Sequence, residues 1–353
     1  MPKDEPHWLE PVLGPRARRW LLPFAVALAA LANLAYPMYV HYDFSHSLDS
    51  RSYLQMASGR FDSARVTHRY RVLVPALAGV VARPIAQVYA RIWPQRPAGY
   101  WPLRFSFYLA NCVLLALAAA CWYRAACISG ATASAAMLAM LAVLTSRWAE
   151  YAAGLPLTDS LYLLVIGLGY YAVLRGPGGR WALALAYLLG PLAKESFLLL
   201  VPWLFWFGRP TLSWPKHTLA LATGLLALAA VHHVVDARIG APAAASVSNA
   251  LEHVENFKYS LHRALSPKGT GELLSIFGVF TFFIPVAYWL EIRGTHRPPW
   301  FAPLGWPEAT LLLLVALHMG LSGDLGRMGF LAAPVFCAAL ALVCTHARRL
   351  LRV

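Results

Sequence analysis

The chain has 353 residues, of which 59% are hydrophobic and only 13% are charged, and its formal net charge is +14. Repeated apolar runs of about 18 or more residues are long enough to cross a bilayer, so the composition excludes an ordinary soluble domain and predicts an all-α, polytopic membrane protein. The positive charge does not indicate nucleic-acid binding, because many basic residues flank apolar runs, as the positive-inside rule predicts for cytoplasmic loops.

Residues 20–40 form the first expected span. The basic flank before it places an N-terminal tail, residues 1–19, in the cytoplasm (Arg16, Arg18 and Arg19). The run is as long as a full span and longer than the apolar core of a signal peptide, so we do not expect it to be cleaved. Residues 41–70 then form an outer loop, and residues 71–92 return inside to a turn that carries basic residues (Arg91, Arg96 and Arg104).

Further apolar runs continue to the end of the chain, at 105–123, 131–149, 160–174, 181–193, 195–207, 217–235, 272–290, 308–322 and 328–345. We therefore expect about 10–11 transmembrane helices in one module, residues 20–346, followed by a cytoplasmic tail, residues 347–353. Counting back from that tail places a second long loop, residues 237–270, outside and every basic cluster inside. Counting forward does not agree, since residues 104–150 need an odd number of crossings but contain two apolar runs. Either one run is re-entrant or one boundary is wrong.

The first outer loop concentrates charge that the rest of the chain avoids. Ser47 is a plausible N-cap for a surface helix from about Leu48 to Phe61, and Asp49 shares one face of that helix with Tyr53. Such a helix could hold Asp49 over the protein interior. Alternatively, Asp49 only complements the helix dipole.

The same loop ends in His68-Arg69-Tyr70-Arg71, directly before an apolar run. Two arginines on the outer side are disfavoured by the positive-inside rule, so an anionic partner such as phosphate is a sensible explanation. The alternative is an interfacial anchor on lipid head groups.

Three other sites place charge beside or within apolar runs. Lys194 and Glu195 interrupt one run, and such charges usually face a cavity, although these two could simply pair with each other. Asp159 opens a span and could be only an N-cap. Asp324 and Arg327 begin the last span, where they could be a cap and its ion-pair partner.

Two other patterns carry no chemistry. The five cysteines lie in or beside apolar runs without metal or disulfide spacing (Cys112, Cys121, Cys127, Cys337 and Cys344). The segment Gly320-Leu321-Ser322-Gly323 matches the G-x-S-G pattern of rhomboid proteases, but the one histidine downstream of it, His346, lies a full span away.

Taken in order, the stretches DSRSYLQMA, HRYRVLVP, TDSLY, LAKES and GDLGRM resemble the GT-C superfamily of integral-membrane glycosyltransferases across residues 20–346. The resemblance implies transfer of a sugar from a polyprenyl-phosphate carrier to a glycan, lipid or protein acceptor. The reaction would occur at the outer face of a bacterial-type inner membrane. Besides donor and acceptor, the expected partners are membrane lipids, and no nucleic-acid partner is expected.

The resemblance also implies roles for individual residues. Asp49, with Asp43 second, would be the general base, and Asp159 would position the acceptor or a metal. Phosphate and donor binding would fall to cationic or imidazole side chains (Arg69, Arg71, Lys194, Arg327 and His68), with Tyr53, Glu195 and Asp324 in support. A divalent ion near Asp49, Mg or Mn, stays open.

Two other functions remain open from the sequence. A transporter or flippase of a lipid-linked or anionic solute would use the same charges but needs access from both sides. A non-catalytic partner in envelope assembly would leave cellular glycan unchanged on mutation of Asp49 or Lys194. The enzyme hypothesis predicts one outward-opening cavity that touches Asp49, Arg71 and Lys194.

Overall fold

A computed structural model describes residues 15–43, 47–96, 99–240, 250–292, 301 and 303–350. Every regular element in these ranges is helical, which confirms the all-α prediction. The α-helices are α1 (Pro15–Leu34), α2 (Tyr36–His41), α3 (Leu48–Ala57), α4 (Leu73–Ile92), α5 (Trp101–Ile128), α6 (Ala133–Leu144), α7 (Arg147–Gly154), α8 (Asp159–Arg175), α9 (Arg180–Ala193), α10 (Val201–Phe207), α11 (Trp214–Ile239), α12 (Ala250–Ala264), α13 (Pro267–Leu274), α14 (Phe283–Ile292), α15 (Trp306–Ser322), α16 (Leu325–Gly329) and α17 (Ala333–Leu350). Short 3-10 segments are η3 (Gly176–Gly179), η4 (Glu195–Leu200), η6 (Gly278–Phe282) and η7 (Phe330–Ala332).

Six segments of the described chain are long and apolar enough to cross a membrane, or seven if a bent pair, Pro267–Leu274 with Gly278–Trp289, is one span. By length and composition the chain is therefore a multi-pass helical membrane protein, but the expected 10–11 full-length spans are not present. The difference lies in short helices. The 12 residues of α6 extend about 18 Å at 1.5 Å per residue, against about 30 Å of hydrocarbon.

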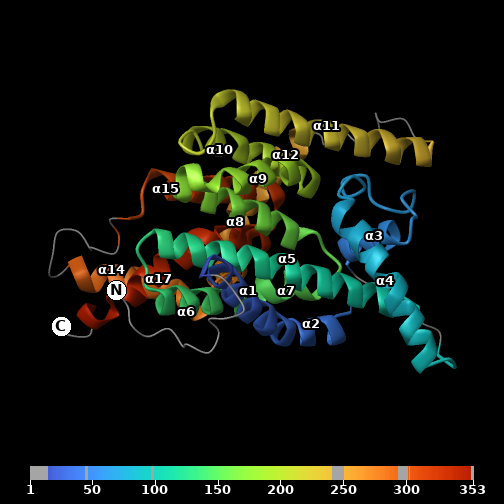
Figure 1. Cartoon of the computed structure of the whole chain (residues 1–353), viewed down its shortest axis with the longest axis horizontal. Helices are drawn as coiled ribbons and strands as arrows, with labels where there is room; N and C mark the ends of the chain where they lie inside the picture. The colour runs from blue at the N-terminus through green and yellow to red at the C-terminus, as the bar shows by residue number, and fades with distance from the viewer. Residues whose placement is uncertain are drawn as a thin grey trace.

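The 28-residue helix α5 sets the axis of the bundle (Figure 1). Helix α1 runs antiparallel to it, because Tyr108 donates a hydrogen bond to the carbonyl of Ala32 while Arg124 lies 5.9 Å from the ring of Trp20. We call the end of the bundle at the start of α5, which carries residues 47–72, the loop end. The opposite end, where the amide of Thr132 donates to Thr345 at 3.1 Å, is the tail end.

Helices α8 and α9 form an antiparallel hairpin, although their residues count as one apolar segment, Asp159–Ala193. At the loop end Ser160 of α8 donates to Asn111 of α5, and at the tail end Tyr171 packs 5.0 Å from Trp20. Lys194, directly after α9, lies 5.7 Å from the ring of Tyr162, so α9 has returned to the loop end.

The following elements pass between the same two ends. After η4 and α10 the chain reaches the tail end, where Thr211 donates to the carbonyl of Ala172 at 3.0 Å. Helix α11 returns, and Tyr70 of the first loop donates to Asp236 near its end at 2.8 Å. The short elements η4 and α10 thus connect the two ends of the bundle, although together they are shorter than a typical membrane span.

Helix α4 corrects the expected topology. Its start follows Arg71 at the loop end, yet Tyr100, beyond its other end, accepts a hydrogen bond from Arg60 of the first loop at 2.6 Å. Arg104 likewise donates to the carbonyl of Tyr39 in α2 at 2.7 Å. The start of α4 and the start of α5, which follows it after residues 93–100, therefore both lie at the loop end. The expected topology placed these two points on opposite sides of the membrane, although Leu73–Ile92 has the length and apolarity of a span. A path in which residues 71–92 stay at the loop end would let α5 make one pass and α6 with α7 the return, and residues 104–150 would then agree with the count from the C-terminus.

Small residues let the helices around α5 approach closely. Ala116, Ala118 and Ala119 are fully buried, and a Cβ on Gly167 of α8 would lie 3.1 Å from the indole nitrogen of Trp122. Such alanine and glycine contacts are typical of membrane helix packing. Residues 1–14 and 351–353 of the expected tails lie outside the described residues, as do residues 241–249 of the second loop.

Candidate functional site

Helix α3 carries Asp49 into the molecule from the first loop. The hydroxyl of Ser47 accepts from the amide of Ser50 at 3.3 Å, which confirms the expected N-cap. The helix ends at Ala57, earlier than the expected Phe61, and Tyr53, Leu54 and Met56 are buried. One side of the helix is therefore packed into the loop end while Leu48 and Arg51 stay exposed, and this burial fixes the direction of the Asp49 side chain.

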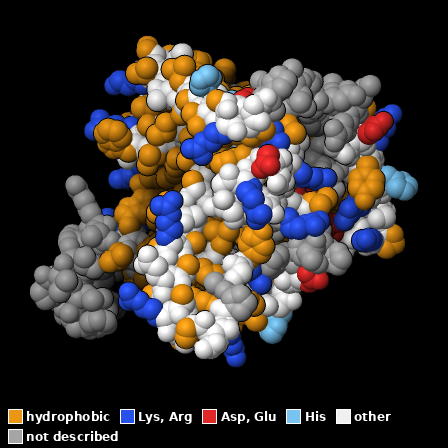
Figure 2. All heavy atoms as spheres, turned by 90° about the vertical axis from the view of Figure 1, so that its right-hand side faces the viewer, with side chains coloured by type: hydrophobic (Ala, Val, Ile, Leu, Met, Phe, Trp, Pro, Cys, Tyr) orange, Lys and Arg blue, Asp and Glu red, His pale blue; other side chains and the backbone are white. Residues whose placement is uncertain are grey.

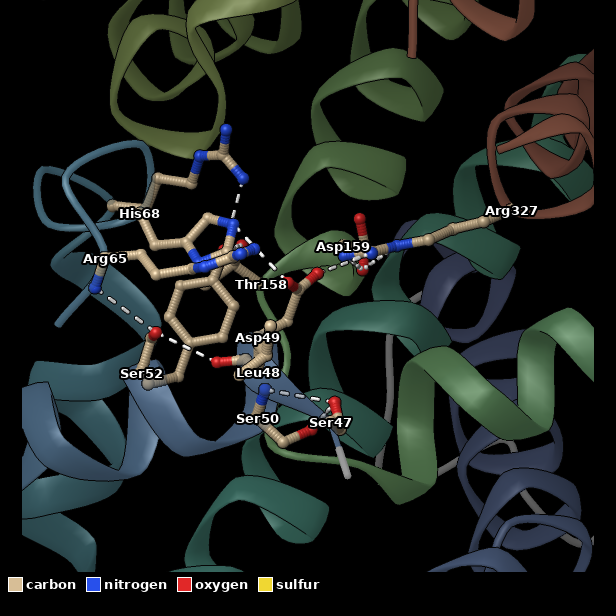
Figure 3. A network of polar contacts seen from close by, with 12 residues as sticks. Ser47, Leu48, Asp49, Ser50, Ser52, Arg65, His68, Thr158, Asp159 and Arg327 are labelled. Carbon is tan, nitrogen blue, oxygen red and sulfur yellow. Dashed lines mark hydrogen bonds and ion pairs between the residues drawn. The ribbon is translucent and has the colours of Figure 1, made fainter. Parts of the chain in front are cut away.

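Arg327 joins two of the predicted carboxylates (Figure 3). Its Nη1 donates to Asp49 Oδ2 at 2.8 Å, while Nη2 and Nε reach Asp159 Oδ2 at 2.6 and 2.9 Å. The backbone amide of Arg327 donates to Asp324 Oδ1 at 3.1 Å, so Asp324 caps α16 and holds the arginine in place. We call Asp49, Asp159 and Arg327 the carboxylate cluster.

The charge state of this cluster follows from its geometry. Burial alone would raise the pKa of Asp49, but the charge and hydrogen bond of Arg327 outweigh it and hold that pKa below its ordinary value of 3.8. Asp49 is therefore ionised at neutral pH and is a weak base while Arg327 holds it.

His68 lies on the other side of Asp49 from Arg327 (Figure 3), with Nε2 3.6 Å from Asp49 Oδ1. Burial lowers the pKa of His68 to about 4, and the nearby arginines Arg71, Arg327 and Arg65 act in the same direction against the attraction of Asp49. The imidazole is neutral at pH 7, so its contact with Asp49 is not an ion pair under those conditions.

A second charged group lies beside the carboxylate cluster. Arg71 donates to Glu195 Oε2 from Nη2 at 2.8 Å and from Nε at 3.2 Å, and its Nη1 reaches Tyr53 Oη at 3.2 Å. Tyr53 Oη also accepts from Thr158, the residue before Asp159, at 3.3 Å. Tyr53 therefore connects the Arg71–Glu195 ion pair to the start of α8.

Lys194 does not pair with its neighbour Glu195, so the interpretation that these two only satisfy each other is wrong. Its ammonium contacts the thioether of Met328 at 3.2 Å and lies 5.7 Å from the ring of Tyr162. Within the described chain, no carboxylate lies within 4.0 Å of this nitrogen. Burial lowers the pKa of Lys194 to about 8, with Asp159 opposing the shift.

A cavity of about 670 Å³ opens beside these residues. Its wall comes from the first loop, the break after α9, α11, α15 and α16 (Val66, Thr67, Tyr70, Arg71, Lys194, Glu195, Ser196, Leu198, Leu199, His232, His318, Leu321, Ser322 and Met328). Of the three residues expected to touch one cavity, Arg71 and Lys194 do so, whereas Asp49 is not among the lining residues.

Two of the remaining predicted residues, Arg69 and Asp43, lie outside the cavity wall. Arg69 donates to the carbonyl of Ala64 in its own loop at 3.3 Å, and Asp43 is exposed just after α2. Glu195 is more central than expected, since its half-exposed carboxylate is the one that lines the cavity. Sequence reasoning missed His318, whose Nε2 lies 2.9 Å from Tyr162 Oη, and a lone histidine inside an apolar helix gives little signal of its position.

The described residues contain no group of three or more His, Cys, Asp or Glu side chains arranged to hold a metal ion. Asp49 and Asp159, the acids considered for Mg or Mn, instead share the guanidinium of Arg327. In this arrangement an arginine supplies the positive charge that a divalent ion would otherwise bring to the two carboxylates.

Fold and site together define a multi-pass all-helical membrane protein with a charged, partly apolar cavity at one end of its bundle. Comparisons with protein-family models, with curated proteins and with solved structures gave no match to this chain.

Proposed function

We propose that the protein is a GT-C-like glycosyltransferase that moves a sugar from a polyprenyl-phosphate carrier to a glycan, lipid or protein acceptor at the loop end, facing outward. The observation that carries the proposal is Lys194: an ammonium on a cavity wall whose hydrogen-bond acceptor is a thioether. Such a group is poorly satisfied by the protein, and a phosphate would complete its coordination.

The cavity has the size and lining that this donor requires. Its volume of about 670 Å³ falls within the range of small-molecule sites, roughly 300–1,000 Å³. Lys194 and Arg71 place two cations on the wall, and Leu198, Leu199 and Leu321 supply apolar surface for the first isoprene units. The same cavity therefore has cationic side chains that could bind a phosphate and apolar surface that could contact its lipid chain.

In the proposed reaction the acceptor oxygen bonds to the anomeric carbon of the sugar as the bond from that carbon to the phosphate oxygen breaks. A carboxylate takes the proton of the acceptor hydroxyl, and polyprenyl phosphate leaves with the bonding electrons. Lys194 and Arg71 offset the negative charge that develops on the phosphate. Inversion at the anomeric carbon follows from a single displacement.

The choice of base depends on how the carboxylates are held. Glu195 lines the cavity, and both hydrogen bonds from Arg71 go to its Oε2. Its other oxygen, Oε1, would then accept the proton of the acceptor hydroxyl. Asp49 is not among the residues that line the cavity, and its pairing with Arg327 lowers its basicity. We therefore assign Glu195 as first candidate for proton removal and Asp49 as second.

The test is to incubate purified, folded protein in nanodiscs with a panel of polyprenyl-phosphate sugars and to follow polyprenyl phosphate by mass spectrometry. Lys194→Met should lower kcat/KM by about 10²–10³-fold, the cost of one charge-stabilising donor. Lys268→Met, at an exposed lysine of α13, is the matched control and should retain activity. Folded protein that turns over no donor, but exchanges a lipid-linked solute across the bilayer, would favour the transporter instead.

A further inference from the structure

Helix α4 has the length and composition of a membrane span but the position of a surface helix. Its start lies at the loop end, and so does the start of α5, which follows α4 after residues 93–100, as the contacts from Arg60 to Tyr100 and from Arg104 to Tyr39 show. A helix of 20 residues would reach about 30 Å if it crossed the bilayer, and its ends would then lie on opposite faces. The apolar surface of α4 must therefore be covered in some other way.

The fully buried residues of α4 all lie in its first turns. Val74, Pro75 and Ala78 are buried, and Gly79 lies so close to α3 that a Cβ there would be 2.8 Å from the carbonyl oxygen of Ala57. Beyond this point the helix leaves the bundle, as Figure 1 shows at its lower right. The remaining turns keep one side against α5 and leave the other open.

The open side of α4 is an apolar stripe. Leu77, Val80, Val88 and Ile92 are spaced so that they follow one side of a helix, with Val80 62% and Ile92 57% exposed. Aromatic side chains extend the exposed surface at the end of the helix and at the start of α5 (Trp93, Tyr100 and Trp101). Tryptophan and tyrosine are enriched where a protein meets the membrane interface.

The polar residues of α4 and of the segment after it are all basic or neutral. Residues 73–104 contain Arg83, Arg91, Arg96 and Arg104 and no Asp or Glu. Lys and Arg side chains are spread among apolar ones over the loop-end face of the molecule (Figure 2). An apolar stripe bordered by arginines is the pattern of helices that lie in the head-group region and bind anionic lipids.

We propose that α4 is an in-plane membrane helix: Leu77, Val80, Val88 and Ile92 enter the acyl region of the leaflet at the loop end, while Arg83, Arg91 and Arg96 bind anionic head groups. The proposal does not depend on the transferase activity. It also explains why arginines that resemble a cytoplasmic cluster lie on the same side as the first loop.

The first experiment fixes the side of the membrane. Cysteine is introduced singly at Arg96, at Ser63 in the first loop and at Ser134 of α6, an exposed residue at the tail end, and sealed vesicles of known orientation are treated with a membrane-impermeant maleimide. The native cysteines are buried or partly buried, and the unsubstituted protein gives their background. Arg96→Cys should be labelled from the side that labels Ser63→Cys. Labelling from the side that labels Ser134→Cys would overturn the proposal.

The second experiment measures depth and lipid dependence in the full-length protein. A nitroxide at Val88 should be accessible to oxygen and shielded from a water-soluble nickel complex, at a depth of about 5–10 Å. A nitroxide at the exposed Ala90, on the other side of the helix from Val88, should show the reverse. Replacing anionic by zwitterionic lipid should make the Val88 label shallower. The triple variant R83Q/R91Q/R96Q should remove that lipid dependence, and Arg180→Gln, at an exposed arginine near the tail end, should not.

Other outcomes assign the stripe to another occupant and reject the proposal. A Val88 label that is shielded from both reagents, with dipolar broadening between labelled copies, would show a second copy of the chain on α4. A label that is open to the nickel complex in every lipid would show that α4 stands in water.

Discussion

Replacing Arg327 by methionine tests whether the carboxylate cluster is held as the structure indicates. The substitution keeps an unbranched side chain of similar length but removes the guanidinium that pairs with Asp49 at 2.8 Å and with Asp159 at 2.6 Å. Asp159 is the more sensitive of the two carboxylates, because its side chain is 9% exposed and that of Asp49 is 26% exposed. Breaking a buried pair from one side costs about 3–5 kcal/mol, since a charge is left uncompensated.

The pH dependence of that loss gives the sharper test. In the parent protein Arg327 holds the pKa of Asp49 below 3.8, so the pairing stabilises the fold above the unfolded pKa and is lost as pH falls through the folded pKa. In Arg327→Met, burial would instead raise the pKa of Asp49. Acidification would then protonate Asp49 and remove the destabilisation that its uncompensated charge causes in the variant. The difference in unfolding temperature between parent and variant should therefore be largest near pH 7 and should narrow toward pH 4.

A double-mutant cycle completes the assay in detergent-solubilised protein. Asp159→Asn combined with Arg327→Met should be less destabilised than the sum of the single variants, with a coupling of about 0.5–3 kcal/mol, the range for residues in contact. Additive single losses, or a parent-to-variant difference that stays constant from pH 7 to pH 4, would refute the cluster as described.

Three further predictions follow from single contacts. In the parent protein, kcat/KM of the proposed transfer should fall above pH 8 as Lys194 loses its proton, because the pKa of Lys194 is about 8. In Lys194→Arg this fall should disappear, since arginine stays charged. A fall at the same pH in the variant would exclude Lys194 as its cause. Tyr53→Phe should cost about 1–3 kcal/mol in unfolding free energy, since Arg71 and Thr158 each lose an acceptor; unchanged thermal stability would contradict that link. Gly326→Ala should cost about 1–3 kcal/mol, because its Cβ would lie 2.1 Å from Trp148, whereas Gly271→Ala, with nothing within 4 Å, should cost nothing; equal effects in thermal denaturation would contradict this packing.

The helical fold was predictable because hydropathy reports directly on it, but the path of the chain was not. Residues 71–92 satisfy every requirement of length and apolarity, and Arg91 at their end and Arg96 after them look like a cytoplasmic flank. What decides the position of α4 is a pair of tertiary hydrogen bonds, from Arg60 to Tyr100 and from Arg104 to the backbone of Tyr39. Hydropathy contains no information on such contacts.

The candidate site was predictable as a set of residues and not as a geometry. Charge inside or beside apolar sequence is costly, so Asp159, Lys194 and Arg327 stand out from the amino-acid sequence alone, and Asp49 stands out as part of the charged first loop. Their partners could not be assigned, since Asp49 and Arg327 are 278 residues apart and Arg71 and Glu195 are 124 apart. The pairing of Glu195 with Arg71 rather than with Lys194 depends on how the first loop packs against the break after α9.

The division of the site into two parts has a physical reason. The shared arginine reduces the charge of the two carboxylates from −2 to −1, so Asp49 and Asp159 can join α3, α8 and α16 where water is largely excluded. Lys194 has no such partner, and the cost of burying it is instead expressed as a lowered pKa. An anion in the cavity would therefore gain a cation that the protein has already desolvated and aimed at it. The hydroxyl of Tyr53 contacts both Arg71 on the cavity wall and Thr158, the residue before Asp159. An anion bound at Arg71 would therefore be connected to the carboxylate cluster through Tyr53 without contacting the cluster directly.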